Sequence, residues 1–136
     1  MAKISHHAAL IYTMMMVSAS DRNMSDAELS SIGDMVLHLP VFEDFDRKKL
    51  PKVGADCAKL LDEEDGLEEA LSLIKKALPK KLRDTAYALA CDVAAADGQT
   101  SQEELRLLEL IRDRLAIDRL TAAAIECGAR VRHQTI

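Results

Sequence analysis

Residues 93–115, VAAADGQTSQEELRLLELIRDRL, repeat the pattern of residues 17–39, VSASDRNMSDAELSSIGDMVLHL. The two segments are 76 residues apart, and seven of their 23 aligned positions are identical. Their shared polar residues form the string Asp-x-x-x-Ser-x-x-Glu-Leu, which begins at Asp21 in the first copy and at Asp97 in the second. Each string lies between two stretches with apolar residues at helical spacing, so we expect a helix–turn–helix unit to occur twice.

Helical spacing of apolar residues continues outward from both copies, and strand-like alternation is absent. We therefore predict an all-α fold: a single compact domain, residues 1–136, with seven helices in two pseudo-symmetric three-helix halves (about 4–61 and 79–133) and a connecting helix. The expected helices are about 4–19 and 26–39, a third ending near Leu61, a fourth after the acidic turn 62–69, a fifth starting at Pro79, a sixth at about 102–115 and a seventh capped by Asp118.

The composition agrees with one helical domain and excludes several other classes. The 136 residues include 20 Ala and 19 Leu but only 5 Gly and 3 Pro, and 49% of them are hydrophobic. A net charge of −5 argues against nucleic acid as a partner. No apolar run approaches the roughly 20 residues that span a bilayer. Three cysteines without a CxxC pair suit a reducing compartment, so we expect a cytoplasmic protein.

Helix capping is the simplest explanation of the repeated string. In a capping box, a Ser side chain accepts a hydrogen bond from a free backbone N–H, and a Glu three residues later reaches back to the cap residue. Ser25 with Glu28 and Ser101 with Glu104 have this spacing. Capping leaves the first residue of each string unexplained.

A cation site is the alternative explanation. Asp21 and Asp97 fall near the ends of the preceding helices, where the helix dipole disfavours negative charge, so each needs a partner. Two units packed about a pseudo-twofold axis would bring these residues towards Glu28 and Glu104, and four clustered carboxylates repel one another unless a cation bridges them. Oxygen ligands suit Ca²⁺, Mg²⁺ or Mn²⁺, with Zn²⁺ as a further candidate. Both explanations stay open.

The same residues carry a family resemblance. The run AAADGQTSQEEL at 94–105, preceded by YALA at 87–90 and echoed by VSASD at 17–21 and SDAEL at 25–29, resembles the TerB-like tellurite-resistance family over nearly the whole chain. The resemblance implies a cytoplasmic, bacterial, all-helical module for tellurite or chemical-stress resistance. It also implies association with a membrane-embedded Ter protein and an acidic centre that binds a divalent metal.

Carried over to this sequence, the family's acidic positions are Asp21, Glu28, Asp97 and Glu104. The first copy departs from the family pattern, because Arg22 follows Asp21 where a Gly is usual. A cationic side chain at this position could fold over the first half of the site and weaken metal binding.

Two other groups of residues suggest metal or redox chemistry. Met14, Met15 and Met16 with His6 and His7 contain soft and imidazole ligands, but adjacent histidines on a helix point about a quarter-turn apart, and Met is common core filler. The cysteines are the second group: Cys57 and Cys127 lie on apolar stripes that indicate the core, whereas the place and role of Cys91 are open.

No nucleophile, metalloprotease or phosphate-loop motif occurs in the sequence, so we expect a binding module and not an enzyme. A basic segment, KKALPKKLR at 75–83, contributes Lys75, Lys76, Lys80, Lys81 and Arg83. Its charges either form a solvated face with local pairs or dock to anionic headgroups or to an acidic loop of a membrane partner.

Overall fold

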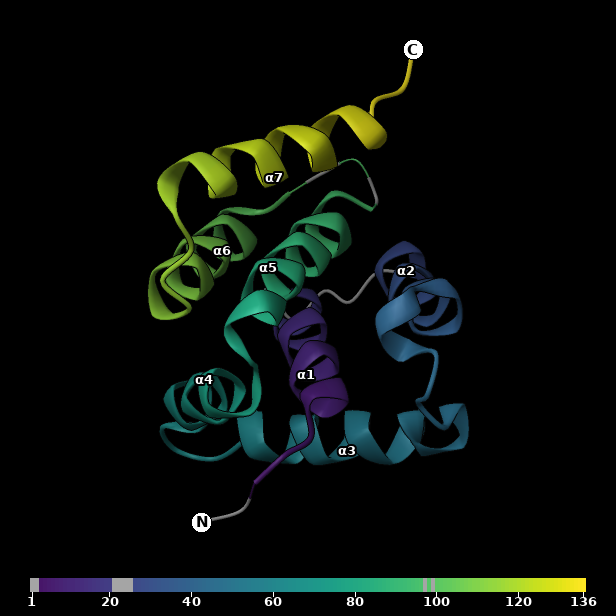
Figure 1. The fold of residues 1–136 in the computed structure, drawn as a ribbon, viewed down its shortest axis with the longest axis vertical. Helices are drawn as coiled ribbons and strands as arrows, with labels where there is room; N and C mark the ends of the chain where they lie inside the picture. Colours follow the sequence, from purple (N-terminus) through teal and green to yellow (C-terminus); the bar gives the residue numbers. More distant parts are fainter. Residues whose placement is uncertain (1–2, 21–25, 97, 99) are drawn as a thin grey trace.

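The computed structural model describes residues 3–20, 26–96, 98 and 100–136. Within these residues the chain is entirely helical, with seven α-helices and two short 3₁₀ helices and no strand, which confirms the predicted fold class. The α-helices are α1 (His6–Ala19), α2 (Asp26–His38), α3 (Leu50–Leu61), α4 (Gly66–Ala77), α5 (Lys80–Ala95), α6 (Gln102–Arg114) and α7 (Arg119–Arg132) (Figure 1). The 3₁₀ helices η1 (Pro40–Phe42) and η2 (Arg47–Lys49) lie between α2 and α3.

Helix α1 is the centre of the domain and packs against α2, α3, α4, α5 and α6. Its sequence from Ala8 to Val17 carries no charge, and side chains on every side of the helix are buried, as the four consecutive residues Ala9, Leu10, Ile11 and Tyr12 show. A helix that is apolar all round is stable only when other elements surround it, and five helices surround α1. In the described part of the chain, no helix is both long and apolar enough to cross a membrane.

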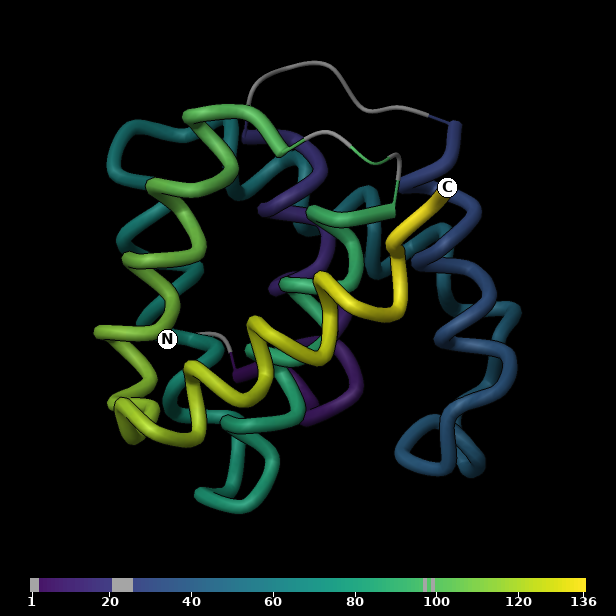
Figure 2. Tube along the Cα trace, turned by 90° about the horizontal axis from the view of Figure 1, so that it is seen from above, coloured from purple at the N-terminus to yellow at the C-terminus, as the bar shows by residue number. Residues whose placement is uncertain are grey.

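The helix bounds follow the 76-residue offset of the sequence repeat. Helix α2 begins at residue 26 and ends at residue 38, and α6 begins at residue 102 and ends at residue 114. Helices α1 and α5, which precede them, end at residues 19 and 95. In both views α2 and α6 lie on opposite sides of the α1–α5 pair (Figures 1 and 2). A pseudo-twofold relation between complete halves stays a prediction.

Short-range chemistry sets the helix starts. The Asp118 side chain accepts hydrogen bonds from the backbone N–H groups of Leu120 and Thr121, both at 3.1 Å, and so caps α7 as expected. Pro79 occupies the cap position of α5, one residue before its predicted place. Asp46 caps η2 instead of a long third helix, and α3 begins at Leu50, so that Pro51 lies within its first turn, where a missing N–H is harmless.

Several apolar residues at helical spacing are exposed, among them Cys127, which we expected in the core. Leu29 and Leu105 are each 44% exposed, Leu120 is 80% exposed and Val131 62% exposed, and Cys127 lies on the surface. Helix α7 packs mainly against α5, where small residues such as Ala122 and Ala129 make the close contact. A helix at the edge of the domain buries a narrower face than its apolar pattern indicates.

Candidate functional site

Of the predicted acidic centre, the structure describes Glu28 and Glu104. Both are the third residue of their helix, α2 and α6 respectively, and both are buried, with 2% of each residue exposed. Asp21, Asp97 and the predicted cap Ser25 lie outside the described residues. Two carboxylates at equivalent repeat positions are therefore buried, which is unusual because an ionised carboxylate loses its hydration when it leaves water.

Glu104 belongs to a capping box at the start of α6. The Ser101 Oγ accepts from the Glu104 backbone N–H at 3.1 Å, and Glu104 Oε1 accepts from the Ser101 backbone N–H at 3.0 Å. These two bonds satisfy two of the free N–H groups at the helix start, and the negative charge lies where the helix dipole favours it. Capping thus accounts for one oxygen of Glu104.

The second oxygen of Glu104 is not accounted for by the cap. Glu104 Oε2 is buried and has no hydrogen-bond partner among the described residues. A buried carboxylate oxygen without a donor costs free energy, and a positive ion is one of the groups that removes this cost. This oxygen is the strongest sign of a ligand at the repeated strings.

Glu28 has a different environment, although its place in the repeat is the same. Its Oε1 accepts a hydrogen bond of 3.2 Å from the hydroxyl of Ser18, a fully buried residue in the last turns of α1. The carboxylate therefore joins α2 to the central helix. Neither Glu28 nor Glu104 belongs to a group of three or more suitably close metal-ligating side chains among the residues that the structure describes.

One group of metal-ligating side chains does occur within the described ranges, and its third member, Asp44, was not among the residues that the sequence suggested. His6 and His7, at the start of α1, lie beside Asp44 from the segment after η1, with one ligand atom of each residue within 4.8 Å of the others. Our expectation that the adjacent histidines point apart was wrong, since their ring centroids are 4.0 Å from each other. No sequence signal indicates this group, because Asp44 is 37 residues beyond His7 and belongs to no motif.

The methionines that we grouped with these histidines belong to the core. Met14 and Met16 are 0% and 2% exposed, and Met15 is half-buried against the same core. Methionine is flexible and fills irregular gaps between helices. The structural role that the sequence favoured for the methionines is therefore the observed one.

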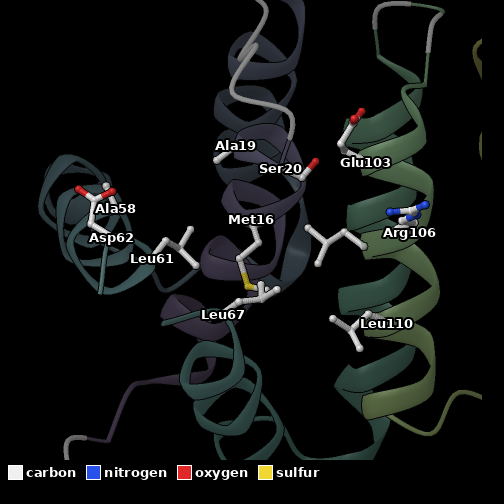
Figure 3. Close-up of a pocket in the computed structure, with 11 residues that line it drawn as sticks. Met16, Ala19, Ser20, Ala58, Leu61, Asp62, Leu67, Glu103, Arg106 and Leu110 are labelled. Carbon is white, nitrogen blue, oxygen red and sulfur yellow. The ribbon is translucent and has the colours of Figure 1, made fainter. Parts of the chain in front are cut away.

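A groove of about 1110 Å³ lies between α1, α3, α4 and α6 (Figure 3). Met16 of α1 lies at its centre next to Leu67, with Leu61 on one side and Leu110 on the other. Its polar lining consists of Glu103 and Arg106 of α6 together with Ser20 and Asp62, which follow α1 and α3. The groove begins at the first turn of α6, the same turn that carries the buried carboxylate.

Cys91, whose place the sequence left open, is a buried free cysteine in α5. Burial raises the pKa of Cys91 to about 12 and that of Cys57 to about 12. Tyr87 is also buried and donates a hydrogen bond of 2.5 Å to Glu126 Oε2, and burial together with this bond raises its pKa. Because thiolates are the reactive form, neither buried cysteine is suited to redox chemistry at neutral pH.

The basic segment forms an exposed corner between two helices. Lys75 and Lys76 lie in the last turn of α4, where the helix dipole favours cations, and Lys80 and Lys81 lie in the first turn of α5, where it does not. All four lysines are exposed, and half-buried Arg83 donates to the Lys75 carbonyl oxygen at 3.4 Å.

A family model described as "Tellurite resistance protein TerB" matches residues 7–126 of the chain. The match covers α1 except its first residue, all of α2 to α6 and more than half of α7, and it contains both repeated strings and the two buried carboxylates. No curated protein and no solved structure matches the sequence significantly.

Proposed function

This chain belongs to the tellurite resistance protein TerB family, and on that premise we propose that it is a resistance module that binds a divalent cation at an acidic centre. The proposed ligands are Glu28 and Glu104, together with Asp21 and Asp97 of the same two sequence strings. The role is that of a binding module in the cytoplasm, without a catalytic step.

The unpartnered oxygen of Glu104 is the observation that carries this proposal. Its neighbour Oε1 is held by the capping box, so the side chain cannot turn Oε2 towards water without breaking that bond. A hard cation satisfies such an oxygen and also offsets the cost of burying the charge. Equivalent burial of Glu28 supports a centre to which both strings contribute.

Calorimetric titration of the chelator-treated protein with Ca²⁺, Mg²⁺, Mn²⁺ and Zn²⁺ tests the proposal. The decisive variant is Glu104→Gln, because glutamine keeps the capping box while it removes the charge. We expect the wild type to bind at least one of the three hard ions, and the variant to bind it at least about tenfold more weakly. Asp97→Asn should have an effect in the same direction.

Glu103→Gln is the matched control, since Glu103 precedes Glu104 in the same helical turn and is exposed. It removes the same charge from the surface and should leave the affinity unchanged within about twofold. The proposal is wrong if none of the hard ions binds, or if Glu104→Gln binds them as tightly as the wild type.

The second candidate is a metal-free protein-interaction domain in which the strings only cap helices. The complete capping box at Ser101 and Glu104 favours it, because this box explains the Ser and the Glu of the string without a ligand. In that case chelators change neither the melting temperature nor the capture of a partner, and Glu104→Gln behaves like the wild type in both measurements.

The exposed lysine corner at Lys75, Lys76, Lys80 and Lys81 supports peripheral attachment to an anionic membrane surface. Each lysine close to such a surface contributes about 1 kcal/mol to attachment. The partner that we propose at the membrane is a membrane-embedded Ter protein. Flotation with liposomes that contain anionic lipid should recover the protein at low salt and lose it at high salt. Recovery that does not depend on salt or on these lysines contradicts the attachment.

A further inference from the structure

We propose that His6, His7 and Asp44 form a second metal site, which takes a borderline transition-metal ion such as Zn²⁺ and is separate from the acidic centre. The site joins the first turn of α1 to the segment after η1. It therefore connects the central helix with the link between α2 and α3.

The position of His7 Nε2 is the first argument. This atom lies 3.0 Å from Asp44 Oδ1 and 2.9 Å from the Val41 carbonyl oxygen. When a metal binds nitrogen and oxygen at about 2.1 Å, neighbouring donor atoms are about 3.0 to 3.4 Å apart. One imidazole nitrogen thus already faces two oxygens at nearly the spacing of a coordination sphere.

The second imidazole comes from His6. Its ring centroid lies 4.0 Å from that of His7, and ligand atoms of both rings and of Asp44 fall within 4.8 Å of one another. His6 is only half-buried and the Asp44 side chain is 80% exposed, so small rotations of these two side chains can close the remaining gap. The buried ring of His7 then serves as the fixed ligand.

The surroundings hold His7 and the Asp44 segment in place. Phe42 and Phe45 lie beside the His7 ring, with centroids 5.8 and 5.2 Å from it. The Phe45 backbone N–H donates to the Phe42 carbonyl at 3.0 Å, so the turn that carries Asp44 is closed by its own hydrogen bond. A site whose ligands are held before binding loses less conformational freedom when the ion arrives.

The donor set selects the class of ion. Two imidazoles with one carboxylate suit Zn²⁺, Co²⁺ or Ni²⁺ better than Ca²⁺ or Mg²⁺, which prefer oxygen. Metal binding at Nε2 requires the neutral tautomer of His7 that carries its single proton on Nδ1, so the proton on Nε2 leaves that atom for solvent when the ion binds. The start of α1 disfavours a cation through the helix dipole, and the negative charge of Asp44 offsets this effect.

Titration of the chelator-treated full-length protein with Zn²⁺, and with Co²⁺ followed by its visible absorption, tests the site. His6→Asn and Asp44→Asn change accessible side chains and leave the core intact. We expect either variant to weaken Zn²⁺ binding at this site at least about tenfold and to remove the Co²⁺ absorption of the imidazole complex. A Cys127→Ser background excludes the exposed thiol as the ligand.

His38→Asn and Asp34→Asn are matched controls, because both residues are exposed on α2 and lie outside the cluster. Both controls should bind Zn²⁺ and Co²⁺ like the wild type. Glu104→Gln should also bind both ions normally at the histidine site, so that a failure of this proposal can be distinguished from a failure of the proposed acidic centre. The proposal is overturned if the wild type binds neither ion, or if His6→Asn and Asp44→Asn bind both as the wild type does.

Discussion

Glu28 and Glu104 occupy the third position of α2 and α6, and both are 2% exposed, yet their contacts differ. Glu28 accepts a hydrogen bond from Ser18 and so connects its helix to α1. The Glu104 side chain bonds within its own first turn and leaves one oxygen without a donor among the described residues. The residue that corresponds to Ser18 in the second half is Ala94, which has no hydroxyl group to offer.

This difference shows that a repeated motif fixes the position of a side chain but not its partner. The partner comes from the neighbouring helix, where the two copies have diverged from Ser to Ala. One copy satisfies its buried carboxylate partly through a contact between helices, and the other has an oxygen available for a ligand. We therefore expect the second string to contribute more to cation binding than the first.

Removing the Ser18 hydroxyl from α1 should lower the free energy of unfolding more than any other change that tests this comparison. Ser18→Ala takes a donor from the buried carboxylate of Glu28, and a hydrogen bond to a charged group contributes about 2 kcal/mol. We expect the free energy of unfolding, measured by urea denaturation, to fall by about that amount. Ser30→Ala on the exposed face of α2 is the control and should change it by less than about 0.5 kcal/mol. An equal effect of both substitutions would mean that the Ser18–Glu28 contact contributes nothing.

The sequence was sufficient to predict most of the fold. Helical spacing and cap residues placed seven helices with ends within a few residues, because both depend on neighbours along the chain. The surroundings of each helix could not be predicted in the same way. The burial of α1 on every side and the 80% exposure of Leu120 depend on which helices cover them, and one sequence does not contain that information.

In the candidate sites, too, the sequence predicts the positions of residues but not their neighbours from other helices. The repeat identified Glu28 and Glu104 as special, since an internal offset compares positions without knowledge of the fold. It could not reveal that Ser18 reaches one of them, because hydrogen-bond donors on another helix follow no local spacing. The sequence drew attention to His6 and His7 but could not indicate Asp44 for the same reason, since the α2–α3 link brings Asp44 back to the start of α1.

Breaking the cap of α6 should have a smaller effect than breaking the Ser18 contact. Ser101→Ala removes the acceptor for the Glu104 N–H, and loss of such a cap costs about 1 kcal/mol. Ser101→Asn keeps an acceptor at the cap position and should restore most of the stability. Thermal unfolding of the three proteins in chelator measures both steps. If the Asn variant is as unstable as the Ala variant, capping is not what Ser101 contributes.

Giving the second half a hydroxyl donor that corresponds to Ser18 should change the free energy of unfolding least, and should raise it instead of lowering it. Ala94→Ser places a hydroxyl on α5 at the position that corresponds to Ser18, where it can donate to the free oxygen of Glu104. The new bond to a charged group outweighs the lower helix propensity of Ser, so the metal-free protein should gain about 0.5 kcal/mol. The same bond competes with a cation for that oxygen, and the affinity for hard ions should fall in calorimetry. A loss of stability without a change in affinity would show that the two halves do not superpose at this position, which would restrict the repeat to the sequence.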